Sequence, residues 1–230
     1  MKKVAVIQSN YIPWKGYFDI INDVDLFVFY DDVQYSKNDW RNRNKIKTNQ
    51  GVRWLTIPVG KGIHRLIHEV SIDDHTWQKK HYDTIRFNYS KSPYYKNYEE
   101  LIYDIYCTNE WRNLSDLNKL TIKEICKLCK IKTEFTDSSE YKITGEKQEK
   151  LINLLISANA DIYVSGPAAK AYINEEDFIK KGIKIIWKDY SGYPEYPQLF
   201  PPFEHNVSIL DLLLNTGERA PYYIWGWRSD

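Results

Sequence analysis

The stretch that decides the fold is Lys3-Val-Ala-Val-Ile7, then Gln8-Ser-Asn-Tyr-Ile-Pro-Trp-Lys-Gly-Tyr-Phe18, and then Asp25-Leu-Phe-Val-Phe-Tyr30. The first and last segments are short apolar runs, which predict buried strands. Between them, residues 16–22 follow a proline closely and fit a short helix. A strand, a helix and a second strand within 30 residues form a βαβ unit, so we expect two parallel strands joined by a right-handed crossover.

The alternation of helix and strand resumes toward the C-terminus. Helices are predicted at 146–158, 175–181 and 208–215, and strands at 54–58, 66–72, 132–136, 161–165 and 183–188. The residues between 75 and about 131 have a helical pattern throughout. The sequence therefore predicts one α/β domain over residues 1–230, with a parallel sheet covered by helices on both faces and a helical insertion, a subdomain or lid, at about 75–131.

The composition excludes several classes of protein. The 230 residues carry 32 Lys+Arg and 31 Asp+Glu, a net charge of +1, which argues against a general nucleic-acid binder. No apolar run approaches the ~20 residues of a membrane span, and the apolar run 4–7 is too short for a signal peptide. Three cysteines do not make a disulfide framework. These features predict a cytoplasmic protein that does not bind membranes.

Charge is distributed unevenly near the N-terminus. Residues 19–32 contain five acidic side chains and no basic one, whereas residues 36–53 contain six basic side chains and one acid. The basic segment interleaves Arg, Asn and Trp, which are phosphate donors beside a stacking surface. Ligands of parallel sheets bind beyond the carboxyl ends of the strands, where residues 8–14 and 31–37 meet. We expect a site for an anionic small molecule such as a nucleotide there, although a solvated basic loop is the alternative.

The sequence predicts neither a metal nor a tightly bound cofactor. Residues 8–18 lack the glycine pattern of a P-loop or a dinucleotide fingerprint, so neither ATP nor NAD is specified. Cys126 and Cys129 form an isolated pair without the further ligands that zinc needs. His64 and His68 have chelating spacing only on a helix, and their segment is predicted to be a turn followed by a strand.

The opening segment resembles the WbqC-like family, whose typical opening is Gln-Pro-x-Tyr-x-Pro-Trp-x-Gly-Tyr-Phe. Here Ser9 replaces the usual proline. The agreement continues at Asp32, Gln34, Lys37, Trp40, 42–47, 56–59, Trp77, His81, 163–167, Tyr172, 196–198 and 208–217. Members of this family are found among O-antigen and other surface-polysaccharide genes, and a glycine (aminoacyl) transferase role has been suggested. The resemblance implies an enzyme that modifies an amino sugar in lipopolysaccharide O-antigen biosynthesis.

A second resemblance concerns the architecture. The first strand, a loop at a helix start and a strand ending in Asp31-Asp32 resemble the Rossmann-like (HUP-like) nucleotide-binding layout. Residues 13–17 stand where the nucleotidyltransferases of that group have their histidine signature. The fold is therefore expected to be similar, while nucleotidyl transfer is disfavoured.

Acyl transfer to an amine needs a base, donors for the oxyanion and a positioned acyl donor. The predicted bases are His81, which shares a helix face with Trp77, and Asp32 at a strand end. The alternative for His81 is a structural or surface histidine, and the alternative for Asp32 is a helix N-cap or an ion pair with the basic segment. The predicted substrate-binding residues are Gln8, Asn10, Tyr11, Trp14, Tyr17, Lys37, Trp40, Asn42, Arg43, Asn44, Lys47, Ser165, Gly166 and Tyr172.

These residues lead to one main hypothesis and two rivals. The main one is a transferase that attaches an acyl or aminoacyl (glycyl-type) group to the amine of a nucleotide-linked amino sugar. The acyl donor is a thioester of an acyl carrier protein, coenzyme A or an aminoacyl-tRNA. The rivals are a non-catalytic module that binds a nucleotide-sugar or a carrier protein, and a nucleotidyltransferase-like activating enzyme.

The C-terminal third is rich in aromatic residues and prolines. Six aromatic residues lie between 187 and 203, interleaved with four prolines, and four more lie between 222 and 227. Such flat side chains suit sugar rings or a base, and they equally suit packing over the sheet or a homodimer contact. We expect packing or dimer contact for the first group, and we expect the tail to dock on its own subunit or on a second one.

Overall fold

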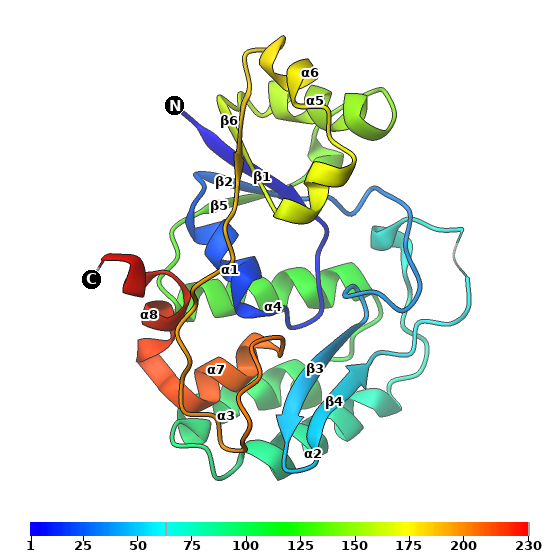
Figure 1. The fold of residues 1–230 in the computed structure, drawn as a ribbon. Coiled ribbons are helices and arrows are strands. Elements are labelled where there is room, and N and C mark those ends of the chain that lie inside the picture. The colour runs from blue at the N-terminus through cyan, green and yellow to red at the C-terminus, as the bar shows by residue number, and fades with distance from the viewer. Residues whose placement is uncertain (63, 230) are drawn as a thin grey trace.

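The fold is described from a computed structural model, in which residues 1–62 and 64–229 are described. They contain a parallel sheet in the order β5-β2-β1-β6-β7 (Figure 1). Its strands are β1 (Lys3–Ile7), β2 (Leu26–Phe29), β5 (Glu134–Asp137), β6 (Ile162–Ser165) and β7 (Lys184–Trp187). Val4 of the central strand pairs with Leu26 on one side and with Tyr163 on the other. The predicted parallel α/β fold is confirmed.

Helices cover both faces of the sheet, and alternate strand residues point to each face. On one face, Ala5 and Phe27 join the core that contains α1 (Lys15–Asn22) and α4 (Leu114–Leu128). On the other face, Val4 packs with α5 (Lys147–Ser157) and α6 (Glu175–Ile179) (Figure 1). This division follows from the two-residue period of a strand, because successive side chains point in opposite directions.

The middle of the chain is helical, as predicted. It forms α2 (Thr76–Tyr89), α3 (Tyr95–Tyr103), the π turn η2 (Asp104–Thr108) and α4. These helices contribute to the same hydrophobic cluster as α1, together with α7 (Ile209–Thr216) and α8 (Ala220–Ile224). The short 3₁₀ turns are η1 (Ile67–Glu69), η3 (Ser138–Glu140), η4 (Pro167–Ala171), η5 (Gly217–Arg219) and η6 (Gly226–Ser229). The insertion thus packs into the core below the sheet (Figure 1).

The basic segment is not the loop that the sequence suggested. Most of it forms an antiparallel hairpin of β3 (Arg43–Thr48) and β4 (Gly51–Thr56). The predicted strand 54–58 is therefore displaced toward the N-terminus. The sequence did not predict its partner strand, β3. The inward residues Asn44, Ile46 and Thr48 alternate with Arg and Lys, and two of these three inward residues are polar, so no alternation of apolar and polar residues is visible.

The predicted strand 66–72 is also wrong. Instead, the 3₁₀ turn η1 forms there, and the Glu69 carboxylate accepts a hydrogen bond from the Leu66 backbone N–H at 2.7 Å. Ile67 and Val70 are both buried at a spacing of three residues, which suits one helical turn better than a strand. A carboxylate that satisfies free N–H groups at a helix start stabilises that turn.

The C-terminal aromatic residues pack on their own chain. Tyr193 and Tyr196 are buried, and the Trp227 ring lies against Gly192 and Tyr193. Arg228 forms an ion pair with Asp19 of α1, which ties the tail to the first helix. The expected packing and the docking of the tail on its own subunit are confirmed.

Three further expectations can be compared with the described residues. Cys126 and Cys129 are buried in the core and Cys107 is exposed, with all three thiols free. Across residues 1–62 and 64–229, no group of His, Cys, Asp or Glu is arranged to hold a metal ion. Within the same ranges, every helix is too short or too polar to cross a membrane.

Candidate functional site

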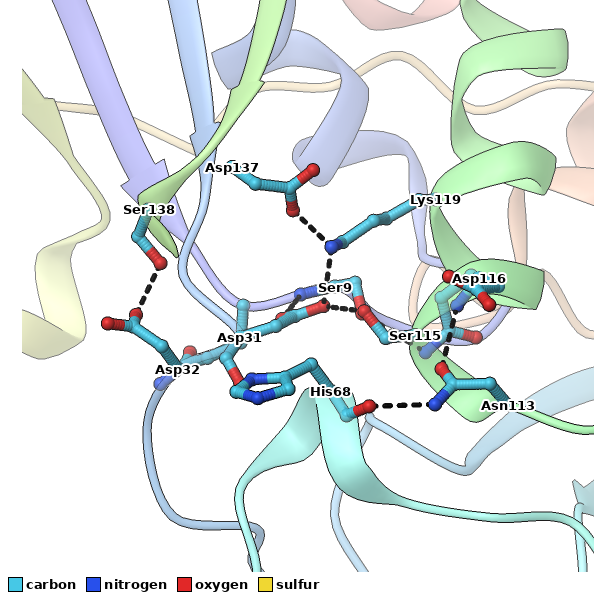
Figure 2. Close-up of polar contacts among 12 residues, drawn as sticks. Ser9, Asp31, Asp32, His68, Asn113, Ser115, Asp116, Lys119, Asp137 and Ser138 are labelled. Carbon is cyan, nitrogen blue, oxygen red and sulfur yellow. Dashed lines mark hydrogen bonds and ion pairs between the residues drawn. The ribbon is translucent and has the colours of Figure 1, made fainter. Parts of the chain in front are cut away.

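The segments that follow β1 and β2 meet at one edge of the sheet, as the sequence predicted. The Ser9 backbone N–H donates to Asp31 Oδ1 at 2.8 Å, and the Tyr11 N–H donates to the Trp40 carbonyl at 3.0 Å. Asp31 also accepts a hydrogen bond from the Ser115 hydroxyl of α4 (Figure 2). Asp31 therefore anchors both strand ends to α4.

The Asp31 network is closed on itself. Lys119 of α4 lies between Asp31, at 3.8 Å, and Asp137 at the end of β5 (Figure 2). The His68 Nδ1 donates to the Asp31 carbonyl at 3.0 Å, and the His68 carbonyl accepts from Asn113 at 2.7 Å. Each of these groups has protein partners, so the network joins the ends of β1, β2 and β5 to α4.

Asp32 points away from that network. Its carboxylate accepts a hydrogen bond from Ser138 and forms an ion pair with Lys150 of α5 at 2.8 Å. Burial by itself raises the pKa of the Asp32 carboxyl, but the hydrogen bonds from Lys150 and Ser138 and the charge of Lys150 outweigh it. The net pKa lies below its usual range, so Asp32 is a carboxylate at neutral pH.

Asp32 lines a large hollow that we call the sheet-edge cavity. Its volume is about 990 Å³, and it lies at the ends of β1, β2 and β6 and at the start of α5. Its polar lining includes Gln8, Asp32, Gln148, Lys150 and Tyr172. The central strand β1 has β2 on one side and β6 on the other. The order in which the chain adds strands to the sheet therefore changes direction at β1. Ligands of open parallel sheets bind at such a reversal.

A second hollow, the hairpin cavity, lies on the other side of the same loop. It has a volume of about 350 Å³ and is lined by Asn10, Pro13, Trp14, Trp40, Asn44, Lys45 and Asn206. Gln8 lines the first cavity and Asn10 the second. Two residues of extended chain span no more than about 7 Å, so the two cavities are close neighbours.

The predicted binding residues divide into three groups. Gln8 and Tyr172 line the sheet-edge cavity, while Asn10, Trp14, Trp40 and Asn44 line the hairpin cavity. Lys37 is exposed, and Arg43 lies over the ring of Trp54 on the outer face of the hairpin. Gly166 begins the 3₁₀ turn η4 after β6.

The third group consists of buried side chains with structural partners. The Tyr17 hydroxyl donates to the Gln8 carbonyl, and the Asn42 amide donates to the Ile57 carbonyl. Lys47 Nζ reaches the Pro202 carbonyl, and Ser165 donates to the Tyr163 hydroxyl. These four residues, Tyr17, Asn42, Lys47 and Ser165, are buried and line neither cavity.

His81 does not lie at the sheet edge with Asp32. Its side chain is in α2, 6% exposed, and its Nδ1 is 2.8 Å from the Tyr11 hydroxyl, which also bonds Tyr106. It lines neither cavity. Burial lowers the pKa of His81 to about 4. His81 and Tyr11 thus pack α2 against the loop, and the role of His81 as a base stays a prediction.

The buried imidazole makes stability depend on pH. Folded His81 stays neutral down to about pH 4, whereas its unfolded pKa is near 6.5. Between these values the unfolded chain binds more protons, so stability falls as the pH falls. We expect His81 to lower the free energy of unfolding by about 2 kcal/mol when the pH falls from 7 to 5. Urea unfolding of the wild type and of His81→Gln at both pH values measures it.

The control for this experiment is His64→Gln, because His64 is exposed. The pH dependence of unfolding should be reduced in His81→Gln and unchanged in His64→Gln. An identical pH dependence in wild type and His81→Gln would contradict the burial of a neutral imidazole.

Several residues at the cavities were missed from the sequence. They include Gln148, Lys150 and Tyr163 at the sheet-edge cavity, and Lys45 and Asn206 at the hairpin cavity. Lys150 lies within the predicted helix 146–158, but its partner Asp32 is 118 residues away in the chain. One signal in the sequence pointed to Lys150. In a parallel α/β sheet, the helices that follow the strands begin at the edge where ligands bind.

Comparisons with known proteins agree with the resemblance seen in the opening motif. A family model described as the WbqC-like protein family matches residues 8–223. The chain is 47% identical over 226 residues to the uncharacterized protein Rv1507c of Mycobacterium tuberculosis (strain ATCC 25618 / H37Rv), covering 97% of this chain and 98% of that protein. No solved structure matches the chain. The matched span includes every lining residue of both cavities except Val6, and the chain belongs to the WbqC-like protein family.

Proposed function

We propose that this protein is a transferase that attaches an acyl or aminoacyl (glycyl-type) group to the amine of a nucleotide-linked amino sugar. The observation that carries the proposal is the Asp32 carboxylate, which lines a large cavity at the carboxyl ends of the strands. The family's association with surface-polysaccharide genes supports an amino sugar of the O-antigen as the acceptor.

Asp32 and Lys150 supply the two charges that this reaction needs. When the amine attacks the acyl carbonyl, the nitrogen becomes positively charged and the carbonyl oxygen negatively charged. A carboxylate takes the proton from this nitrogen, and an ammonium group stabilises the oxyanion. The new C–N bond forms as the bond to the donor's sulfur or oxygen breaks, and the proton passes to that leaving atom.

The rest of the cavity suits a sugar. Gln8 and Gln148 present amide groups that pair with hydroxyls, and the exposed Tyr172 ring presents a flat face to the mouth of the cavity. Ser165 is buried, and its hydroxyl donates a hydrogen bond to the Tyr163 hydroxyl. We therefore propose a direct transfer, without an acyl-enzyme intermediate on Ser165. The donor is a carrier-protein thioester, coenzyme A or an aminoacyl-tRNA.

The proposal is tested by incubating the purified protein with a nucleotide-linked amino sugar and each class of acyl donor in turn. Mass spectrometry should detect an amide product whose added mass equals that of the acyl group. Pyrophosphate exchange with ATP is measured in parallel, because it is the signature of an activating enzyme. If none of the donors gives an amide product, or if the protein exchanges pyrophosphate with ATP, the proposal is overturned in favour of one of its rivals.

A further inference from the structure

The outer face of the hairpin carries a pair of exposed tryptophans. In β3 and β4, Ile46 and Leu55 point into the core, whereas Arg43, Lys45 and Trp54 lie on the opposite side. Trp40 from the preceding loop rests against Trp54, with ring centroids 5.5 Å apart and an angle of 34° between the rings. Both tryptophans are 40% exposed. Indole rings of this size are normally covered, so a pair of them at the surface indicates a binding face.

Two cations, Arg43 and Lys45, lie beside the rings, and neither forms an ion pair at contact distance with a described residue. Lys45 Nζ is 5.1 Å from the centre of the Trp54 ring, and the Arg43 guanidinium is 4.3 Å from it. Among the described ion pairs neither cation has a carboxylate partner, and the buried Nε of Arg43 has no hydrogen-bond partner there. The neighbouring acid, Asp39, is already bonded to Ser36 and Arg41. Positive charge is therefore available beside a flat apolar surface.

We propose that this face and the adjoining hairpin cavity bind a phosphorylated nucleoside. The base stacks on Trp40 and Trp54, and its phosphates pair with Lys45 and Arg43. Asn10 and Asn206, which line the same cavity, are placed to bond the ribose or the edge of the base. An indole ring can stack on any base, and a guanidinium can donate two hydrogen bonds to one phosphate. The tryptophan pair and the two cations therefore both fit a phosphorylated nucleoside.

The ligand has two possible sources that share this chemistry. One is the nucleotide of the amino-sugar acceptor, and the other is the adenosine phosphate part of a coenzyme A donor. In both cases the ligand extends past Asn10 and Gln8 toward Asp32, and this part of the inference rests on the proposed transfer reaction. The binding of a nucleotide at the tryptophan pair does not depend on that reaction.

Isothermal titration calorimetry with UDP and with adenosine 3′,5′-bisphosphate tests the inference on the full-length protein. We expect at least one of them to bind, and Trp54→Ala and Arg43→Ala each to weaken that binding about tenfold or more. Trp54→Phe keeps a stacking surface and should stay within a few-fold of the wild type. Preference for UDP identifies the acceptor as the source, and preference for the adenosine bisphosphate identifies the donor.

Three control variants separate binding from folding and from catalysis. Val52→Ala changes an exposed residue of the same hairpin, and Phe87→Ala removes an exposed aromatic ring from α2. Both should bind as the wild type does. If Trp54→Ala does not fold, Lys45→Gln takes its place, with the same expected loss. Asp32→Asn should also bind normally, so failure of transfer and failure of binding are distinguishable.

Three results would overturn the inference. The first is the absence of binding of both nucleotides at millimolar concentration. The second is equal affinity in the wild type, Trp54→Ala and Arg43→Ala. The third is tighter binding of a single-stranded oligonucleotide than of either mononucleotide, because the ligand would then be a nucleic acid.

Discussion

Replacing Asp32 by asparagine is expected to lower kcat/KM for amide formation by about 10²–10⁴-fold, the range typical of losing a positioned base. Asparagine keeps the shape of the side chain but has no charge and takes no proton. The loss should appear in kcat rather than in KM, because the proton moves only after the amine has bonded to the carbonyl carbon. Steady-state kinetics with the donor class that yields product in the transfer assay measures it.

The matched control is Asp73→Asn, because Asp73 is an exposed aspartate outside both cavities. Its activity should equal that of the wild type. Since the pKa of Asp32 lies below its usual range, this carboxylate stays charged at alkaline, neutral and mildly acidic pH. The rate should therefore rise with pH only through deprotonation of the acceptor amine. Full activity in Asp32→Asn would favour the non-catalytic binding module.

Replacing Asp19 by asparagine is expected to lower the free energy of unfolding by about 3–5 kcal/mol, the cost of breaking a buried ion pair. Asp19 is 0% exposed. It pairs with Lys188 at 2.7 Å, accepts two hydrogen bonds from Arg228 at 2.9 and 2.8 Å, and accepts another from Tyr193. Asparagine leaves both cations without their shared counter-ion. The cluster joins α1 to the end of β7 and to the C-terminal turn, so the tail should loosen first.

Urea unfolding followed by circular dichroism measures this loss, which corresponds to a fall in Tm of roughly 6–20 °C for a chain of this size. Asp23→Asn is the matched control, because Asp23 pairs with the same Lys188 but is 40% exposed. It should cost less than about 1 kcal/mol. A similar small loss in Asp19→Asn would show that Lys188 and Arg228 are well solvated without Asp19.

The two adjacent aspartates illustrate the limit of sequence reasoning at the site. The pattern 25–30 predicted a strand that ends just before Asp31 and Asp32, and the strand is there. Neighbouring residues at a strand end point to opposite sides, so one of them reaches α4 and the other reaches the cavity. Which of the two aspartates reaches the cavity depends on the register of β2 against β1 and on the positions of Lys119 and Lys150. None of these is encoded locally.

His81 and the basic segment show the same limit. The spacing of Trp77 and His81 correctly placed both on one face of a helix, but it did not say whether that face is buried. The face packs on Tyr11 and Tyr106, and burial there lowers the pKa of the imidazole, so His81 is neutral at pH 7. In the basic segment, the charged residues 43 and 45 lie on the outer face of a hairpin. Local charge composition describes a loop and such a strand equally well.

The sequence by itself determined the five strands of the sheet, most of the helices, the edge at which ligands are expected, and the family. These follow from hydrophobic periodicity, from the rules of parallel sheets and from a long opening motif. Only the tertiary structure decided that Asp32 pairs with Lys150, that His81 is buried, and that Trp40 meets Trp54 beside Arg43 and Lys45. The physical reason is that burial and side-chain contacts are set by the packing of segments far apart in the chain.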